Sequence, residues 1–204
     1  MRPFPFAVHP LPFTWPYAFF FWVVIFWVFW PEFRLTQRAR ESVKRPDSPD
    51  RGSLALILLT NRLAAIAAFA VCGIEATCVP PAWRVPWFWI GIGMLISGGL
   101  LRRHCFRMLG EYFTGDVNAR ADQPVIDRGA YRWIRHPSYT AGMLLFTGIG
   151  VALGNWLSAL IMAATMAIVY AYRVRIEEET LLKTLGEPYR KFMDTRKRFI
   201  PGLF

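Results

Sequence analysis

Residues 123–140, which read QPVIDRGAYRWIRHPSYT, are the first of two polar stretches whose side chains could do chemistry. Pro137 restricts His136 to extended backbone, so a helix should begin directly after it. The start of a helix offers free backbone N–H groups and the positive end of its dipole, which can hold a carboxylate. Tyr131 and Tyr139 flank this start, and their rings can enclose a flat ring or a cation. The stretch therefore has the residue types of a small-molecule site.

Residues 173–189, which read RVRIEEETLLKTLGEPY, are the second stretch. Arg173, Glu177 and Leu181 follow one another at i, i+4 and i+8, so they share one face of a helix. A guanidinium there can donate two parallel hydrogen bonds to a carboxylate or a phosphate, and a carboxylate can bind an ammonium group or a pair of hydroxyls. The residues alone leave open a second interpretation, an ordinary membrane-surface helix with solvated charges.

The composition indicates what kind of protein must position these stretches. The 204 residues are 54% hydrophobic and 16% aromatic, yet the net charge is +10. Apolar runs alternate with charged loops, a pattern typical of a multi-span membrane protein, and spans in lipid must satisfy their own backbone groups as helices. The charges gather at the ends of the runs, where headgroups and topology explain them. We therefore expect an all-α integral membrane protein in contact with membrane lipid, and no nucleic-acid partner.

The apolar runs predict about five transmembrane helices. Pro31 should end the first span, and Pro80 should end the second. The fifth helix should continue beyond the membrane to Leu185, with Gly186 as its stop and Pro188 in the first turn of a short closing helix. The five predicted spans are residues 14–30, 53–79, 86–101, 137–153 and 156–172.

The distribution of basic residues predicts the orientation in the membrane. Lysines and arginines crowd the loop after the first span, residues 102–135 and the tail after Arg173, whereas the opposite side has only Arg2 and Arg84. The positive-inside rule then places the N-terminus outside and the C-terminus inside. Both polar stretches face the cytoplasm in this arrangement, so the loop 105–136 and the C-terminal helices should form one cytosolic site.

Several residues outside the two stretches bear on the prediction. Arg62 lies inside the second span, about 13 Å from its start at 1.5 Å per residue, and Glu75 lies near its far end. A charge inside a span suggests function, although a snorkelling arginine explains it as well. Cys72, Cys78 and Cys105 form no CxxC pair, so we expect no disulfide and no metal site. The chain has no cleaved-signal pattern at its start and no CaaX box at its end.

Three segments together resemble one enzyme family. GAYRWIRHPSYTAG at 129–142, RVRIEEETLLKTLGEPYRKF at 173–192 and RFIPG at 198–202 resemble the isoprenylcysteine carboxyl methyltransferase family, and its phospholipid N-methyltransferase relatives are similar. The resemblance covers roughly residues 100–204, and the combination of RHPSY with R-x-x-x-E-E-x-x-L and G-x-x-Y is specific. This chain has Gln123 and Ala130 where the family usually has His and Pro.

The resemblance implies S-adenosyl-L-methionine as the methyl donor, bound without a Rossmann domain. It implies that Glu177 holds the amino group of this cofactor and that Arg173 binds and orients the acceptor, which makes these two the catalytic residues. The resemblance also implies a methyltransferase core in residues 102–204. With the three N-terminal spans that the apolar runs predict in 1–101, we expect one membrane domain over residues 1–204. The other implied cofactor-binding residues are Gln123, Val125, Ile126, Tyr131, His136, Pro137, Ser138 and Tyr139.

The favoured reaction is methylation of the carboxylate of a lipophilic or prenylated acceptor that enters between the helices of spans two to four. A carboxylate is ionised at neutral pH and needs only a cation such as Arg173 to position it. An amine acceptor would need a base, for which Glu178 is available. Phospholipid N-methylation and small-thiol S-methylation are the alternatives. An NADPH-dependent enzyme resembling the sterol reductases and a non-catalytic scaffold are more distant ones.

Overall fold

Five long helices and one short helix form the fold. The computed structural model describes residues 9–42, 50–113, 117, 119–120 and 122–200, and in this part of the chain there is no strand beyond isolated bridges. The expected all-α fold is therefore confirmed. The helices are α1 (Tyr17–Ser42), α2 (Ser53–Val71), α3 (Arg84–Leu109), α4 (Pro137–Ala152), α5 (Trp156–Leu185) and α6 (Glu187–Thr195).

The helices make this an integral membrane protein. Ser53–Val71, Pro81–Leu109 and Trp156–Leu185 are long and apolar enough to cross a bilayer, and Tyr17–Pro31 is a shorter apolar segment. Helix α4 has 16 residues, so it rises about 24 Å and falls short of a hydrocarbon core of about 30 Å. Five long helices agree with the predicted architecture, while the number that crosses the bilayer stays a prediction.

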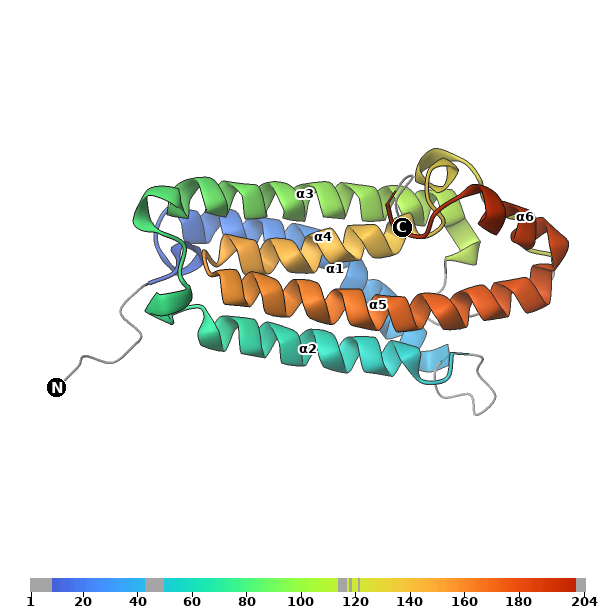
Figure 1. The fold of residues 1–204 in the computed structure, drawn as a ribbon, viewed down its shortest axis with the longest axis horizontal. Helices are drawn as coiled ribbons and strands as arrows, with labels where there is room; N and C mark the ends of the chain where they lie inside the picture. Colours follow the sequence, from blue (N-terminus) through green and yellow to red (C-terminus); the bar gives the residue numbers. More distant parts are fainter. Residues whose placement is uncertain (1–8, 43–49, 114–116, 118, 121, 201–204) are drawn as a thin grey trace.

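Glycines bring α3, α4 and α5 close together. In Figure 1, α3, α4, α5 and α2 lie side by side in that order, and α1 packs mainly on α3. A Cβ atom on Gly91 of α3 would lie 2.4 Å from the Ala152 nitrogen of α4, and one on Gly150 would lie 2.6 Å from the Ala159 Cα of α5. Glycine at these two positions therefore allows the helix backbones to approach closely.

Pro31 ends the apolar segment Tyr17–Pro31, as predicted for the first span, but it does not end the helix. Helix α1 continues through Pro31 to Ser42. A proline lacks the N–H that would bond to the carbonyl four residues before it, here that of Trp27. Arg103 supplies the missing donor, because its Nη2 lies 2.5 Å from the Trp27 oxygen and its guanidinium lies 3.8 Å from the centre of the Trp27 ring. A side chain from α3 thus allows α1 to continue.

The second span is shorter than predicted, because α2 ends at Val71 rather than at residue 79. Asn155, before the first turn of α5, binds this end: its Nδ2 donates to the Val71 oxygen at 3.2 Å and to Thr77 Oγ1 at 2.7 Å. Glu75 consequently lies in a short 3-10 helix, Glu75–Thr77, outside the span.

The third helix is longer than predicted at both ends, and the later helices end as predicted. Helix α3 includes Pro86 in its first turn, where a missing N–H leaves no bond unmade. Gly186 ends α5 with a positive φ of 64°, and Pro188 lies in the first turn of α6. The extension of α5 to Leu185 is confirmed.

Candidate functional site

Helix α5 and the start of α4 bring the two polar stretches together. Tyr139 lies in the first turn of α4, and its hydroxyl donates to Glu177 Oε2 at 2.5 Å. The Nε of Arg173 donates to the same hydroxyl at 3.2 Å. Tyr139 therefore links the guanidinium and the carboxylate that share one face of α5, as the i, i+4 spacing predicts.

Asp50 is a buried partner of Arg173 that was not among the predicted site residues. The two side chains form a buried salt bridge and lie 123 positions apart in the chain; Asp50 is 1% exposed and Arg173 is 3% exposed. Arg173 Nη1 also donates to the Ser53 hydroxyl. Loss of one member of such a pair would leave a buried charge uncompensated.

Asp50 also ties together the start of α2 and the loop that precedes the first polar stretch. Its carboxylate accepts hydrogen bonds from the backbone N–H groups of Leu54 and Val117, each at 2.9 Å, and from the Ser53 hydroxyl at 3.1 Å. Burial opposes ionisation, but these bonds and the Arg173 guanidinium outweigh it, so the pKa of Asp50 lies below its ordinary value. Asp50 is therefore ionised and connects the start of α2, the loop at Val117 and Arg173 of α5.

A sequence signal for Asp50 exists, although it is weak. An aspartate that precedes an apolar helix by three residues can accept bonds from the first N–H groups of that helix. The predicted loop after the first span has four acidic residues, Glu32, Glu41, Asp47 and Asp50, and the positive-inside rule, which counts lysines and arginines, does not distinguish Asp50 among them. The contact with Arg173 has no local signature, because it depends on how α2 and α5 pack.

Glu178 lies on another face of α5 and holds the C-terminal segment against the start of α4. Its Oε1 lies 3.1 Å from His136 Nε2 and 2.9 Å from Arg135 Nε, and its Oε2 lies 2.7 Å from Arg198 Nη2. The Arg135 N–H does not point at the oxygen, so this contact is ionic rather than a hydrogen bond. Glu178 is 4% exposed and does not line the cavity described below. The structure therefore gives no support to Glu178 as a base for an amine acceptor.

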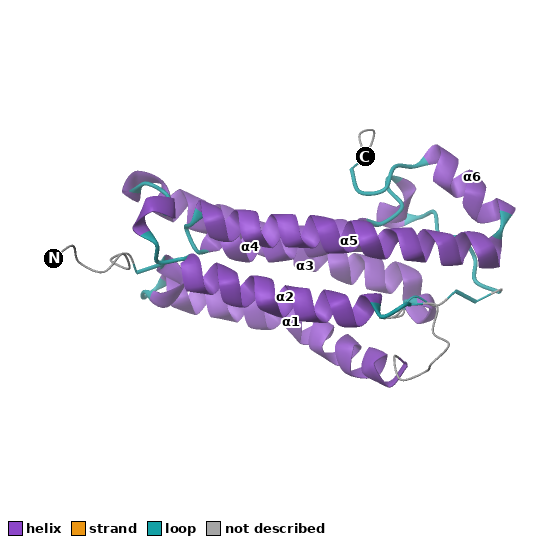
Figure 2. Ribbon diagram, turned by 60° about the horizontal axis from the view of Figure 1, so that its bottom comes forward, coloured by secondary structure: helices purple, strands orange, loops and turns teal. Residues whose placement is uncertain are grey.

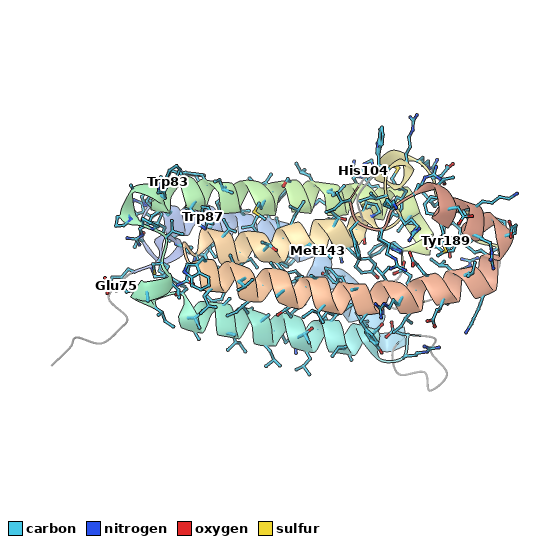
Figure 3. All side chains as sticks on the ribbon, in the orientation of Figure 1. Glu75, Trp83, Trp87, His104, Met143 and Tyr189 are labelled. Carbon is cyan, nitrogen blue, oxygen red and sulfur yellow. The ribbon has the colours of Figure 1, made fainter. Side chains whose placement is uncertain are left out.

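One cavity of about 730 Å³ lies among these elements. It is lined by all of the predicted site residues except Pro137: Gln123, Val125, Ile126, Tyr131, His136, Ser138, Tyr139, Arg173 and Glu177. Pro137 is buried in the first turn of α4 and contributes helix geometry instead. Residues from distant segments thus meet as predicted, at the end of the bundle where Figure 3 labels Tyr189 and His104.

Aromatic hydroxyls line the polar end of the cavity together with the charged pair. Tyr131 and Tyr189 are both buried and both line it. Burial raises the pKa of both phenols. The proximity of Cys105 raises the pKa of Tyr131 further, and the proximity of Glu177 does the same for Tyr189. They remain neutral at physiological pH and can therefore donate hydrogen bonds or cover a ring. Tyr189 comes from α6, which lies beside the end of α5 in Figure 2.

The cavity continues as an apolar limb among α1, α2 and α4. Phe29, Leu58, Ala65, Phe146 and Ile149 line it there. Helix α1 packs on α3 and helix α2 packs on α5, and the C-terminal part of α1 leans away from α2 in Figure 2. Two chemically different ends, one charged and aromatic and one hydrocarbon-like, therefore belong to one cavity.

Comparison with known proteins points to one family. The model of the isoprenylcysteine carboxyl methyltransferase family matches residues 90–183. Protein-S-isoprenylcysteine O-methyltransferase B of Arabidopsis thaliana is 30% identical over 117 residues, which cover 55% of this chain and 59% of that protein. The protein-S-isoprenylcysteine O-methyltransferase of Mus musculus is 27% identical over 164 residues, which cover 77% of this chain and 57% of that protein.

A solved structure shares the fold. It is the eukaryotic intramembrane Ras methyltransferase ICMT, with a TM-score of 0.62 and 26% identity, covering 70% of this chain and 52% of that one. This chain thus spans between half and three fifths of the length of the relatives named here. Through residues 90–183 and the relatives that share them, the chain is similar to the isoprenylcysteine carboxyl methyltransferase family.

Proposed function

We propose that this chain is an S-adenosyl-L-methionine-dependent methyltransferase that, as a single membrane domain, methylates the carboxylate of a lipophilic, prenyl-like acceptor. One observation carries the proposal: a single cavity joins the Arg173–Tyr139–Glu177 chain of hydrogen bonds to an apolar limb within the bundle. A charged end suits the reacting groups, and an apolar limb suits the hydrocarbon part of the acceptor. The family relationship supports methyl transfer as the reaction class.

The polar end has the chemistry that the methyl donor requires. Glu177 offers a carboxylate to its ammonium group, while Tyr131, Tyr189 and His136 offer rings for its flat base and its sulfonium. The cavity volume of about 730 Å³ lies within the range of about 300–1,000 Å³ usual for small-molecule sites. Gln123, Val125, Ile126, Ser138 and Tyr139 would complete the pocket. When bound, S-adenosyl-L-methionine supplies a methyl group already activated by its sulfonium.

Arg173 would orient the acceptor, and Asp50 would orient Arg173. The guanidinium is held from one side by Asp50 and Ser53 and by the Tyr139 hydroxyl at its Nε. A side chain fixed in this way can align an ionised carboxylate without being reorganised during the reaction. Because a carboxylate needs no base, the protein mainly supplies alignment and the exclusion of water.

Replacement of Arg173 by lysine is expected to lower turnover far more than donor affinity. The lysine keeps the charge but loses the planar fork that contacts Asp50, Ser53 and Tyr139 together. We expect kcat to fall by roughly 10²-fold, since misplacement of an orienting group has effects of that size. Steady-state kinetics and equilibrium binding of the donor measure the two quantities. Equal turnover in the variant would contradict the role of Arg173 in orienting the acceptor.

The apolar limb would hold the hydrocarbon part of the acceptor, which would enter from the lipid between helices. Substitutions of limb residues such as Ala65 are then expected to change the KM for the acceptor and to leave that for the donor unaltered. Unchanged acceptor KM values across a set of such variants would count against this route.

Transfer of labelled methyl groups to a farnesylated cysteine analogue and to a membrane lipid extract tests the reaction itself. Label that is released by mild alkali is a methyl ester, the expected result. Label that survives alkali is an N- or S-methyl group and would favour the phospholipid or small-thiol alternatives. If the protein does not bind the donor at all, competition with NADPH tests the reductase alternative.

The proposed orientation places the site in the cytoplasm. Cys78, which is partly exposed, lies at the opposite end of the bundle, near Asn155 and the short helix Glu75–Thr77. A membrane-impermeant thiol reagent added to intact cells is therefore expected to label Cys78, while the other two cysteines are buried. Loss of the label in Cys78→Ser identifies the site. Labelling that needs permeabilised cells would reverse the orientation.

A further inference from the structure

One face of α2 forms a wall of the cavity along much of its length. Leu54, Ile57, Leu58, Asn61, Arg62 and Ala65 line the cavity, at the helical spacing of i, i+3, i+4, i+7, i+8 and i+11. Four of these residues are apolar, as expected for a limb that holds hydrocarbon. Asn61 and Arg62 are polar and adjacent, so they interrupt an otherwise apolar wall.

Asn61 and Arg62 are polar side chains with unmet hydrogen-bonding capacity among the described residues. Asn61 Oδ1 is buried and has no hydrogen-bond partner within residues 9–42, 50–113, 117, 119–120 and 122–200. Within the part of the chain that the structure describes, Arg62 makes no hydrogen bond or ion pair. A buried amide oxygen without a partner is unfavourable, and so is a guanidinium inside a membrane helix, here an exposed one, unless a ligand or a lipid headgroup satisfies it. Helix α2 also lies outside residues 90–183, which the family model covers.

The position of this pair relative to the reacting end follows from the geometry of α2. Ser53, at the first turn of α2, contacts Arg173 directly, so it marks the level at which the acceptor carboxylate would lie. Arg62 is nine residues further along α2 and therefore about 13 Å deeper along the helix axis. A purely hydrocarbon chain would pass this pair without satisfying either side chain.

We propose that Asn61 and Arg62 form a second polar subsite, which selects acceptors whose apolar chain carries a hydroxyl or amide group about 13 Å from the methylated carboxylate. Such a group can donate to the Asn61 oxygen and accept from the Arg62 guanidinium at the same time. The inference rests on the proposed function for the identity of the reacting end. It narrows the acceptor from any prenyl-like carboxylate to one that is functionalised along its chain.

A pair of S-alkylcysteine acceptors tests the subsite, one with an unsubstituted chain and one with a hydroxyl at the matching distance. We expect the wild-type protein to prefer the hydroxylated acceptor by roughly tenfold in kcat/KM, a typical effect of a hydrogen bond to a charged group. The preference is expected to fall towards unity in Asn61→Leu and in Arg62→Leu. Both substitutions keep α2 apolar and helical. Leu63→Ala is the matched control, because Leu63 is adjacent but does not line the cavity.

The remaining outcomes separate this inference from the proposed function. If neither acceptor is methylated, equilibrium binding of the same pair still tests the subsite, and tighter wild-type binding of the hydroxylated one supports it while the proposed reaction fails. An equal preference in wild type and both variants overturns the subsite. The subsite is also overturned if the change in kcat/KM caused by Arg62→Leu depends on the anionic lipid content of the vesicles and not on which acceptor is used. Arg62 would then bind a lipid phosphate.

Discussion

Replacement of Glu177 by glutamine is expected to weaken binding of S-adenosyl-L-methionine strongly, while the protein keeps its fold in detergent. Glutamine keeps the size of the side chain and removes the charge that would pair with the ammonium group of the donor. Loss of one partner from a desolvated charge pair costs about 2 kcal/mol or more, which is a decrease in affinity of at least roughly 30-fold. Titration calorimetry with the donor measures the affinity.

Glu179→Gln is the matched control for this substitution. Glu179 lies two positions along α5, and its side chain is 55% exposed in a surface pair with Arg51. Its substitution is expected to leave donor affinity unchanged, because exposed pairs contribute little. Unchanged affinity in Glu177→Gln would remove Glu177 from the donor site, whatever the methyl acceptor is.

The second large effect is expected for Asp50→Ala, which removes a buried partner of the Arg173 guanidinium. Removal of one member of a buried pair typically destabilises a protein by about 3–5 kcal/mol. The double variant Asp50→Ala with Arg173→Met is expected to recover much of that loss, because it removes both charges. Unfolding midpoints in detergent, measured for the two single variants and the double variant, give the coupling between the residues.

Glu187→Ala provides the control for Asp50, because its pair with Arg190 is exposed on α6. We expect its midpoint to stay near that of the wild type. If Asp50→Ala is as stable as this control, the buried pair does not contribute to the folded state. If the double variant is no more stable than Asp50→Ala, the loss comes from the Leu54 and Val117 hydrogen bonds rather than from Arg173.

The contribution of Asp50 to the free energy of unfolding depends on pH in a defined direction. Its pKa in the folded protein lies below its ordinary value. The stabilisation is therefore fully present above the unfolded pKa of about 3.9, and it is lost as the pH falls through the lower folded value. Asp50→Asn is expected to flatten this acid limb of the stability curve, because the amide does not titrate there.

The cavity is lined by residues from both sides of the predicted boundary between the three N-terminal spans (1–101) and the methyltransferase core (102–204). Phe29 of α1 and the α2 residues from Leu54 to Ala65 line it together with residues of the later half. Asp50 also lies before α2 and binds Arg173 of α5. The family model matches residues 90–183, so α1 and α2 contribute to the cavity from outside the matched segment.

Local sequence signals predicted the later helices closely, together with the residues that line the candidate site. Apolar runs and the stops at Gly186 and Pro188 act within a few residues, so α4, α5 and α6 could be predicted closely. The i, i+4 spacing of Arg173 and Glu177 on one helix is equally local, and Tyr139 lies in the first turn that Pro137 starts. Local backbone rules were sufficient for these features.

Only the tertiary structure decided the contacts between residues far apart in the chain. The Asp50–Arg173 pair, the Arg103 donor that lets α1 continue through Pro31, and the Asn155 contacts that end α2 each join different helices. In each case a side chain from another helix supplies a hydrogen-bond or ionic partner that local sequence rules do not include. Which side chain supplies that partner depends on helix packing, and packing is set by the whole arrangement of close glycine contacts and buried apolar faces rather than by any one segment.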